Sequence, residues 1–360
     1  IVVDCGMAFP GDDMYGIDLI IPDVSYLIKN RARIRGLFIT HGHEDHVGAI
    51  PYVLKQLNMP IYCTRFTAGL IKLKLEEHGL VKSTKLITVE PGKSVRAGKF
   101  TVEFIHVNHS IADAVAFAIH TPVGTVIMTG DFKIDPTSED GMTDLGRFGM
   151  LGKEGVYALL CDSTNVERQG YTPSESVVSE SLDRHFKGCK NRIIVTTFAS
   201  NMHRIQAVFN IAHRHGRKVA VTGRSMENIL KVATELDYLH LPENTLVDLN
   251  QIKSIPKDKL VIFCVHIPLR NATSFNRETV RNLLKEFDNV HIMAGHTHYA
   301  QNYIDGDVYE HIHGAVCGAW WKSTINVDGT PNGYGVYDIS GSKIENWYYK
   351  PTRLSKDFQI

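Results

Sequence analysis

The sequence has no excess charge of either sign. Its 360 residues include 39 Lys and Arg and 39 Asp and Glu, so the formal net charge at pH 7 is zero. This balance excludes a polycation that coats nucleic acid over its whole surface, although it permits a local basic patch. Apolar residues make up 43% and charged residues 22% of the chain, which is typical of folded globular proteins and not of disordered ones. At this length the chain suits about two domains.

Long apolar runs and paired cysteines are also missing. No run approaches the roughly 20 apolar residues of a membrane span, and no basic-then-apolar leader opens the chain, so we expect no membrane partner. The six cysteines are scattered without a C-x-x-C pair, which predicts free thiols in a cytoplasmic protein rather than a disulfide framework. The chain begins at Ile1 inside the strand-like run IVVDCG, from which we expect an N-terminally truncated or processed chain.

Short β-branched runs alternate with helical patterns, which predicts an α/β fold. Closely spaced strands over 86–130 predict a stretch of antiparallel sheet. The polar segment 135–149 predicts a long loop, and the segment 241–259, with two prolines and little periodicity, predicts a domain boundary. Residues 299–350 have strand-like aromatic and glycine-rich segments without a clear helix. Helices are expected at 47–57, 66–79, 175–186, 202–216, 226–238 and 277–287.

The 18 histidines stand out, because histidine is the commonest metal ligand and a frequent general acid or base. The segment THGHEDHVGAIPYVL joins a predicted strand to a predicted helix and contains four potential ligands. Alternate side chains of an extended segment share a face, so the first two can hold one ion, and after the turn the next two can face a second ion. Imidazole with carboxylate suits Zn²⁺, or Mn²⁺ where oxygen ligands dominate. The four residues are His41, His43, Asp45 and His46.

Two later residues suit the same site. His109 follows one predicted strand and Asp131 follows another, and strand ends that meet at one edge of a sheet are where α/β proteins build their sites. His109 can complete a three-histidine set for the first ion, and Asp131 can bridge both ions. Asp4, at the end of the first strand, is either a carboxylate that orients a ligand histidine or a structural strand-end residue.

H-G-H-E-D-H, the later histidine and the later aspartate together resemble the metallo-β-lactamase hydrolase superfamily. The surrounding segments, among them DCGMAFP, VNHSIADA, TGDFKID and CDSTNVER, resemble ribonuclease J, a bacterial family of the β-CASP nuclease branch, from Ile1 to about Lys259. The resemblance implies a metallo-β-lactamase-type αββα sandwich with a partial β-CASP α/β insertion.

The same resemblance implies a metal-dependent hydrolase that degrades and processes RNA, ribosomal RNA included, as a 5′-to-3′ exonuclease and as an endonuclease. Its substrate would be single-stranded RNA with a 5′-monophosphate, and a homo-oligomer is expected. Two zinc ions, with Mn²⁺ or Mg²⁺ as alternatives, would activate a hydroxide for in-line attack and neutralise the charge of the transition state. The implied catalytic carboxylates are Asp45, Asp131 and Asp162, of which Asp162 matches the first acidic motif of the β-CASP branch or forms an Asx-type turn.

RNA binding has local support in the sequence. From Arg184 to Lys218 there are eight basic residues and no acidic one. Such a stretch inside a neutral protein is either an electrostatic footprint for a polyanion or a solvated helix face. The start of the predicted helix at 202 offers free backbone N–H groups, which favour a phosphate. The candidates for holding the RNA backbone are Ser200, Asn201, His203 and Arg204.

The family pattern breaks near Lys259. A complete ribonuclease J continues with an S-G-H motif and a second H-G-E-type motif, which supply a substrate-facing histidine and the last histidine ligand of the second metal, and neither motif is present. Residues 259–360 instead resemble the C-terminal part of calcineurin-like metallophosphoesterases, a C-terminal segment that is atypical after a β-CASP insertion. Its weaker metal-ligand candidates, His266, His296 and His298, are either ligands or hydrogen-bonded strand-end residues, because the D-x-H and G-N-H motifs of that family are absent.

Three arrangements stay open: a chimera of two truncated proteins, a tail that donates His296 or His298 to the first site, and a tail that acts as a structural cover. The expected domains are a metallo-β-lactamase-like catalytic domain over 1–170, a partial β-CASP-like RNA-binding domain over 171–258 and a phosphoesterase-like segment over 259–360. RNA phosphodiester hydrolysis is the leading function. The alternatives are a metallophosphoesterase centred on the tail and an inactive protein that binds metal and RNA.

Overall fold

The computed structural model describes residues 1–8, 14, 17, 19–137, 141–164, 166–167, 169–171, 174–190, 192–265, 278, 281–282, 284–285, 290–294, 301–306, 308–312, 333–340 and 343–351. The chain divides into two compact units, of which the first contains residues 1–194 and 199–262 and the second contains residues 195–198 and 263–360. Every candidate ligand from the first half of the sequence lies in the first unit.

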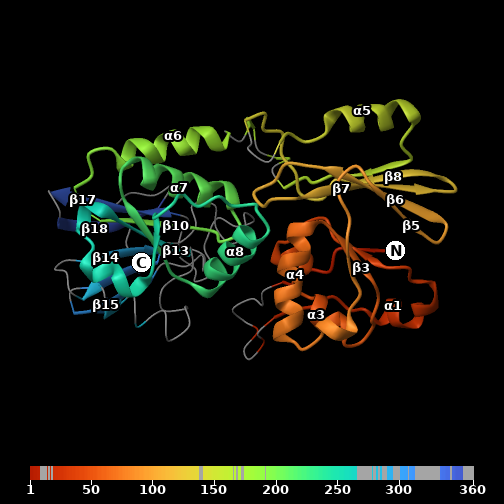
Figure 1. The fold of residues 1–360 in the computed structure, drawn as a ribbon, viewed down its shortest axis with the longest axis horizontal. Helices are drawn as coiled ribbons and strands as arrows, with labels where there is room; N and C mark the ends of the chain where they lie inside the picture. The colour runs from red at the N-terminus through yellow and green to blue at the C-terminus, as the bar shows by residue number, and fades with distance from the viewer. Residues whose placement is uncertain are drawn as a thin grey trace. The chain divides into compact units, whose positions relative to one another are not determined.

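The first sheet is short and parallel, and its two inner strands are mostly buried. Its strands, in the order β1-β2-β3-β4, are Val2–Val3, Leu37–Phe38, Ile61–Cys63 and Leu86–Thr88. Helices α1 (Ser25–Lys29), α3 (Ile50–Leu54) and α4 (Arg65–Glu77) cover one face (Figure 1). Because successive strand side chains point to opposite faces, Leu37 packs with these helices whereas Phe38 packs on the other side.

The second sheet has the order β5-β6-β7-β8-β9. Its strands are antiparallel from β5 to β8, as expected within 86–130, and β9 joins β8 in parallel. The first strand of that range, β4, instead belongs to the parallel first sheet. Helix α5 (Leu145–Glu154) covers its outer face, where Leu151 packs with Ile105 and Ala116. The strand bounds are β5 Ser94–Ala97, β6 Phe100–His106, β7 Val115–Thr121, β8 Gly124–Met128 and β9 Ala158–Leu160.

An aromatic cluster joins the two sheets face to face. The Phe38 ring stacks on Tyr62 at 4.7 Å, and Phe104 meets Phe117 edge-on at 4.9 Å between ring centroids. Phe38, Phe104 and Phe117 are fully buried. Removing such apolar surface from water is the main favourable term in folding. The layers therefore run helix, sheet, sheet, helix, which confirms the predicted αββα sandwich.

Two local expectations were wrong. The predicted loop 135–149 ends in helix α5, because Asp144 caps it by accepting a hydrogen bond from the Arg147 N–H at 2.9 Å. The glycines inside this helix hide its helical pattern in the sequence. The predicted helix 47–57 is two short helices, α2 (Glu44–Val47) and α3, and the first of them begins inside the ligand motif.

The rest of the first unit contains the predicted helices α6 (Glu175–Phe186), α7 (Met202–Arg214) and α8 (Arg224–Glu235). A sheet of order β10-β13-β11-β12 accompanies them, and the boundary between the two units falls within β10 and β13. Its strands are β10 Ile193–Thr197, β11 Lys218–Val221, β12 Leu246–Val247 and β13 Leu260–Val265. Among the residues that the structure describes, the 3-10 helices are η1 Arg31–Arg33, η2 Val81–Ser83, η3 Leu249–Ser254 and η4 Lys257–Lys259.

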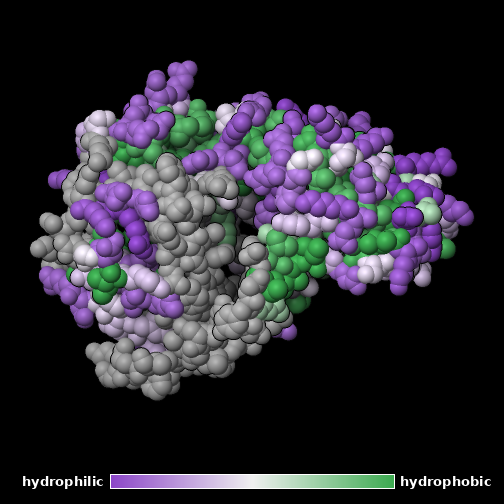
Figure 2. All heavy atoms as spheres, turned by 90° about the horizontal axis from the view of Figure 1, so that it is seen from below, coloured by the Kyte–Doolittle hydropathy of each residue, from purple (hydrophilic) through white to green (hydrophobic). Residues whose placement is uncertain are grey.

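In the second unit, most of the described residues from 290 onward form strands, as the aromatic and glycine-rich pattern of the tail predicts. Three of them make a sheet of order β14-β16-β15, and β17 pairs antiparallel with β18. The bounds are β14 Val290–Ala294, β15 Gln301–Asp305, β16 Val308–Ile312, β17 Gly333–Ser340 and β18 Lys343–Pro351. On the face drawn in Figure 2, hydrophilic and hydrophobic residues are interspersed over the coloured surface. Within the described ranges, each helix is too short or too polar to cross a bilayer.

Candidate metal centre

The candidate ligands follow strand ends. His41, His109 and Asp131 each lie three residues after a strand, namely β2, β6 and β8. Strands β6 and β8 run in the same direction, because each pairs antiparallel with β7, so their ends share one edge of the second sheet. His43 is the N-cap residue of α2 and is extended, with φ −71° and ψ 155°. The local backbone thus delivers four side chains to one place.

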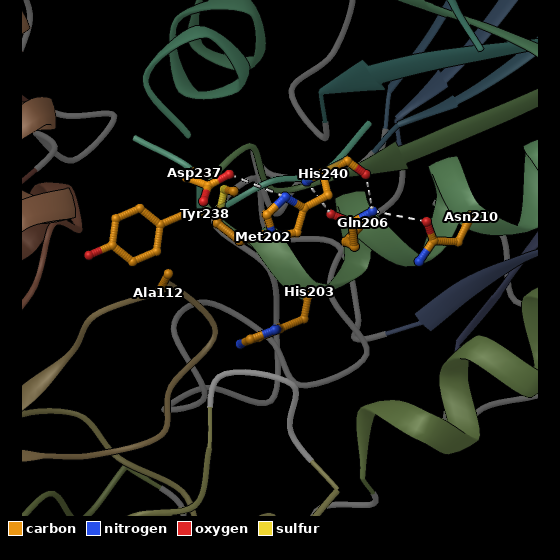
Figure 3. A pocket seen from close by; sticks show the side chains of 8 residues that line it. All are labelled: Ala112, Met202, His203, Gln206, Asn210, Asp237, Tyr238 and His240. Atoms are coloured by element: carbon orange, nitrogen blue, oxygen red, sulfur yellow. Dashed lines mark hydrogen bonds and ion pairs between the residues drawn. The ribbon is translucent and has the colours of Figure 1, made fainter. Parts of the chain in front are cut away.

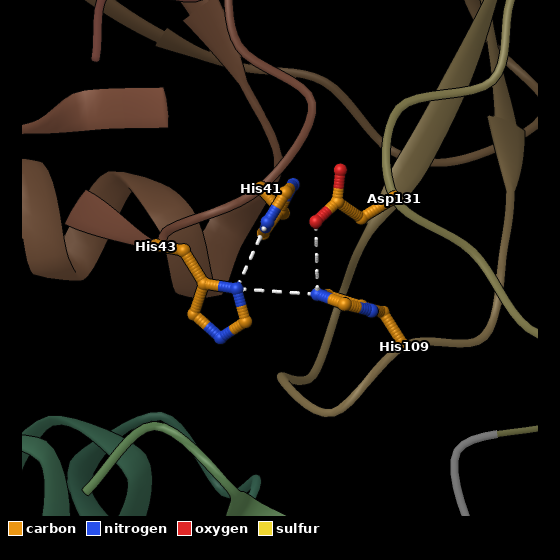
Figure 4. A group of neighbouring side chains, drawn as sticks. All are labelled: His41, His43, His109 and Asp131. Carbon is orange, nitrogen blue, oxygen red and sulfur yellow. Dashed lines mark hydrogen bonds and ion pairs between the residues drawn. The ribbon is translucent and has the colours of Figure 1, made fainter. Parts of the chain in front are cut away.

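Three imidazoles and one carboxylate converge there, as Figure 4 shows. Nδ1 of His43 lies 3.0 Å from Nε2 of His41 and 3.1 Å from Nε2 of His109. Asp131 Oδ2 lies 3.7 Å from the same nitrogen of His109. Each residue offers one ligand atom, and these atoms all lie within 4.8 Å of one another.

Burial keeps these three imidazoles neutral. It is the main cause that lowers the pKa of His43 to about 4 and that of His109 to about 3, and it lowers the pKa of His41 as well. Neighbouring imidazoles add to the effect at His41 and His109. A neutral imidazole has one nitrogen lone pair to offer, so at pH 7 the group presents donors to a cation rather than positive charge.

A second group shares Asp131 with the first. Nε2 of His46 lies 3.5 Å from Asp131 Oδ1 and 3.6 Å from Asp45 Oδ2. The two oxygens of Asp131 therefore face different groups, Oδ1 toward His46 and Oδ2 toward His109. Gly130 makes this possible by turning the chain at φ +57°, a conformation that favours glycine. This is the geometry expected of a carboxylate that bridges two ions.

The acidic residues around Asp131 are crowded. Burial, together with the charges of Asp162 and Asp45, raises the pKa of Asp131, although His46 opposes the effect. Asp131 is partly exposed, at 32% of its side chain, and Asp45 is mostly exposed. Carboxylates that raise one another's pKa are stabilised when a cation neutralises them.

Asp4 fixes the orientation of two candidate ligand histidines. Its Oδ2 lies 2.8 Å from Nδ1 of His46, and an ionised carboxylate only accepts hydrogen bonds, so this nitrogen carries the proton. Thr40 donates its hydroxyl proton to the same oxygen at 2.9 Å and its N–H to Oδ1 at 2.8 Å. The Thr40 hydroxyl can then only accept from Nδ1 of His41, 3.0 Å away. In neutral His41, Nε2 is left with its lone pair directed to the candidate centre. Burial acts to lower the pKa of His46, but the hydrogen bond to Asp4 and the neighbouring carboxylate charges outweigh burial and raise it. A cation held by Nε2 of His46 would therefore have to displace a proton.

Gly6 lets the segment after β1 pass close to the ligand motif. The Cys5 N–H donates to the His46 carbonyl at 2.7 Å. A Cβ atom at Gly6 would lie 1.6 Å from the Asp45 carbonyl oxygen, far inside van der Waals contact. Only glycine fits at this position, so the sequence D-C-G is matched to the turn that carries Asp45 and His46.

The donor set fits a metal ion. Two nitrogens bound tetrahedrally to one zinc at about 2.0–2.1 Å lie about 3.3 Å apart, close to the 3.0 and 3.1 Å found between the imidazole nitrogens. Nε2 of His43 points away from the cluster and is buried. In the described part of the chain, the first group offers four ligand atoms and the second offers three.

Asp162 lies near the group, but part of its carboxylate is already used. Its Oδ1 accepts hydrogen bonds from the N–H and the hydroxyl of Thr164, at 2.9 and 2.8 Å, which is the Asx-type turn that the sequence also allows. Its charge nevertheless reaches the centre, because it raises the pKa of Asp131 and acts to raise that of His109.

The basic stretch contains no acidic residue, but in the structure acidic residues of helix α6 pair with its arginines. Arg204, a candidate RNA contact, pairs with Glu175 of α6 through three hydrogen bonds of 2.9–3.2 Å. Arg214 pairs with Asp183 of the same helix at 3.1 Å. Arg217 is buried. The exposed cations of the stretch include Arg184, Lys187 and Lys190.

The other RNA candidates lie at the start of α7. Asn201 is the N-cap residue, and its Oδ1 accepts from the Arg204 N–H at 3.1 Å. His203 lines a cavity of about 380 Å³, shown in Figure 3, and its Nε2 is buried. The three weaker metal candidates, His266, His296 and His298, lie outside the described residues.

Sequence reasoning missed two residues close to the centre. Thr40 stands directly before H-G-H, so its position was a usable signal for its role beside His41. Tyr238 donates its hydroxyl to Asp113 Oδ2 at 2.9 Å, in the loop that carries His109, although 125 residues separate the two. No local pattern could have linked them.

Three known families match successive segments of the chain, in the order in which their motifs occur in the sequence. Residues 1–172 match the metallo-beta-lactamase superfamily, and residues 190–268 match the beta-CASP domain of ribonuclease J. Residues 310–360 match the C terminal of calcineurin-like phosphoesterase. The chain thus has metallo-β-lactamase and β-CASP domains, and both resemblances found in the sequence are confirmed.

The similar proteins include ribonuclease J of Synechocystis sp., which is 48% identical over 265 residues, covering 73% of this chain and 41% of that protein. Ribonuclease J of Thermus thermophilus is 44% identical over 72% of this chain and 47% of its own length. Ribonuclease J 2 of Staphylococcus epidermidis is 36% identical over 85% and 52%. The chain therefore spans about half or less of the length of these relatives.

A solved structure shares the fold. The crystal structure of a protein of unknown function from Enterococcus faecalis V583 aligns with a TM-score of 0.53 over 81% of this chain and 75% of that one. At 15% sequence identity this likeness concerns the fold alone.

Proposed function

We propose that this protein hydrolyses phosphodiester bonds of RNA with the help of divalent cations, because 73% of the chain aligns with ribonuclease J of Synechocystis. One observation carries the proposal. Three neutral imidazoles and a shared carboxylate meet within 4.8 Å, beside a second group of ligands that uses the other oxygen of the same carboxylate. Paired metal sites of this kind suit in-line displacement at phosphorus.

The roles of the residues follow from their geometry. His41, His43 and His109 would hold the first cation, Asp45 and His46 the second, and Asp131 both. Bound cations would supply a water of lowered pKa and neutralise charge on the phosphate. Asp4 and Thr40 keep the Nε2 atoms of His46 and His41 directed inward, so the site is preorganised.

Zinc is the proposed metal, with manganese or magnesium as alternatives, because three imidazoles favour zinc and the oxygen-rich second group favours a harder ion. Asp162 is proposed as a further catalytic carboxylate through its charge near Asp131. We also retain the domain division at about 170 and 258, and a cytoplasmic location, which the buried thiols Cys5 and Cys63 support.

The proposed substrate is single-stranded RNA with a 5′-monophosphate, cut in exonuclease or endonuclease mode by a homo-oligomer. The start of α7 supports phosphate binding, since N–H groups in the first turn of a helix have no partner within that helix. Ser200, Asn201, His203 and Arg204 are the proposed contacts.

The test combines metal content with cleavage. Purified protein, stripped with chelator and reloaded with Zn²⁺ or Mn²⁺, is expected to cleave a 5′-monophosphorylated single-stranded RNA, and His43→Ala is expected to lose both metal and cleavage. His78→Ala, at the end of α4, is the matched control. Unchanged metal content and cleavage in His43→Ala would refute the proposal. One ion per chain with RNA binding and no turnover would instead favour the inactive binding protein.

A second candidate rests on the family match of the tail at residues 310–360. A calcineurin-like phosphoesterase centred on His296 and His298 would hydrolyse p-nitrophenyl phosphate. That activity would survive His41→Ala but not His298→Ala. The reverse pattern would assign any phosphatase activity to the first unit.

A further inference from the structure

We infer that Tyr238 is a positioning residue for the metal ligand His109, acting through Asp113. The inference deepens the proposed function, on which its kinetic part rests. It assigns to a residue of the segment after α8 a role in a site built from loops more than 100 residues earlier in the chain.

The loop that carries His109 is short and closed. The Val107 N–H donates to the Ala114 carbonyl at 3.1 Å, which ties the two ends of the loop together. Ile111 within it is fully buried, and its Cδ1 would lie 3.4 Å from a Cβ placed on Gly42, between the first two ligands. A displacement of this loop would therefore move His109 relative to the histidines around Gly42.

Asp113 anchors the loop in an unusual conformation. Its φ is +66°, in the left-handed region that residues other than glycine adopt only at a cost. Two bonds to the start of α4 hold it there. Its carbonyl accepts from the Thr64 hydroxyl at 2.7 Å, and its Oδ2 accepts from the Phe66 N–H at 3.0 Å.

Tyr238 binds the same carboxylate oxygen from another element. Its hydroxyl lies 2.9 Å from Asp113 Oδ2, and its ring packs on Phe66 with 5.2 Å between centroids. The bond is supported by close packing of α4 on α8, where a Cβ at Gly69 would lie 2.7 Å from Val232. The Tyr238 ring is thus positioned by its packing on Phe66, and its hydroxyl reaches Asp113 from a segment that follows a helix packed on α4.

The cavity beside α7 gives this contact a link to RNA. Tyr238 and Ala112, the neighbour of Asp113, line it together with His203, one of the proposed RNA contacts (Figure 3). RNA that reaches His203 would therefore approach the Tyr238–Asp113 contact. RNA binding at α7 would then be coupled to the position of His109 through the Tyr238–Asp113 contact.

The experiment compares three variants with a matched control. Tyr238→Phe removes only the hydroxyl. Asp113→Gly keeps the backbone conformation but removes the carboxylate, and Asp113→Asn keeps both an acceptor and tolerance of positive φ. Tyr157→Phe, on a tyrosine that is 73% exposed, is the control.

The readouts are the affinity for Co²⁺, the visible d–d spectrum of the Co²⁺ protein, and kcat and KM for RNA. Tyr238→Phe and Asp113→Gly are expected to weaken Co²⁺ binding about 3- to 10-fold and to alter the spectrum, with kcat falling and KM little changed. Asp113→Asn is expected to retain the wild-type values. The double variant with both Tyr238→Phe and Asp113→Gly should be no worse than Asp113→Gly alone.

A Tyr238→Phe protein that matches Tyr157→Phe in Co²⁺ affinity and spectrum would overturn the inference, as would an Asp113→Asn protein that behaves like Asp113→Gly. The Co²⁺ measurements need no turnover. If the wild-type protein cleaves no RNA, the proposed function fails while these measurements still decide the role of Tyr238.

Discussion

Asp4 Oδ2 lies 2.8 Å from Nδ1 of His46 and also accepts the hydroxyl proton of Thr40, which contacts His41. A single carboxylate therefore sets the proton on Nδ1 in two candidate ligand histidines. His41 belongs to the first group of candidate ligands and His46 to the second. The influence of Asp4 therefore extends over the whole centre.

Asp4→Asn is expected to weaken metal binding about 10- to 100-fold, the usual cost of losing a group that orients a ligand. An asparagine can present its amide N–H₂ to His46 and so favour the wrong tautomer. Competition with a chromophoric chelator measures the change. Asp23→Asn is the control, because that carboxylate accepts from Ser25 in an exposed turn. Equal affinities in the two variants would show that Asp4 is only a strand-end residue.

Gly6→Ala is expected to disrupt the centre, because its Cβ would lie 1.6 Å from the Asp45 carbonyl and the turn must move. Gly152→Ala is the matched control. That glycine is inside α5 with open space around it, so alanine should stabilise the fold by about 0.5–1 kcal/mol. Urea unfolding and metal content together test the pair. Full metal content in Gly6→Ala would contradict the described path of the chain.

Glu175 and Arg204 should affect RNA binding in opposite directions. Glu175→Gln weakens the ion pair that holds Arg204 and should tighten RNA binding several-fold, whereas Arg204→Ala should weaken it. Arg204→Ala should also reduce the slope of log K against log salt by about 0.7, the value for one phosphate contact on a single strand. Arg96→Ala, an exposed arginine on β5, is the control. Binding curves by fluorescence anisotropy would contradict the assignment if both variants bound like wild type.

Asp135 joins the loop after Asp131 to the start of α6. Burial acts to raise its pKa, but hydrogen bonds from Thr137, Ser174 and the Glu175 N–H outweigh burial and lower the pKa to about 2. A depressed carboxyl pKa contributes stability above the unfolded-state value of about 4, and that stability is lost as pH falls toward 2.

Asp135→Ala should therefore cost about 1–3 kcal/mol of unfolding free energy at pH 7. The difference in unfolding free energy between wild type and Asp135→Ala should be constant above pH 5 and should become smaller below about pH 4. Urea unfolding at a series of pH values measures it. If this difference in unfolding free energy stayed constant down to pH 3, the charge of the Asp135 carboxylate would have no part in joining the loop to α6.

The convergence of the candidate ligands was predictable, because H-x-H-x-D-H is local and because His109 and Asp131 each follow a strand. The strand patterns predicted an α/β fold, and the resemblance to the metallo-β-lactamase superfamily supplied the αββα layering, in which Leu37 and Phe38 face two different cores. Helix α5 was missed because three glycines, Gly146, Gly149 and Gly152, mask its amphipathic pattern.

The rest depends on contacts between distant segments. The acid-free stretch predicted free cations, but Glu175 and Asp183 come from the preceding helix and pair with Arg204 and Arg214. The contact between Asp113 and Tyr238 depends on a left-handed backbone and on the packing of α4 against α8. Neither leaves a signal in local sequence.

The most direct test of the account is a crystal structure of the zinc-loaded protein with an anomalous difference map at the zinc edge. The account predicts a peak about 2.0–2.1 Å from nitrogens of His41, His43 and His109, with Asp131 between it and a second peak near Asp45 and His46. The same map would show whether His266, His296 or His298 approaches either ion. A map with no peak among the three histidines would contradict the central claim.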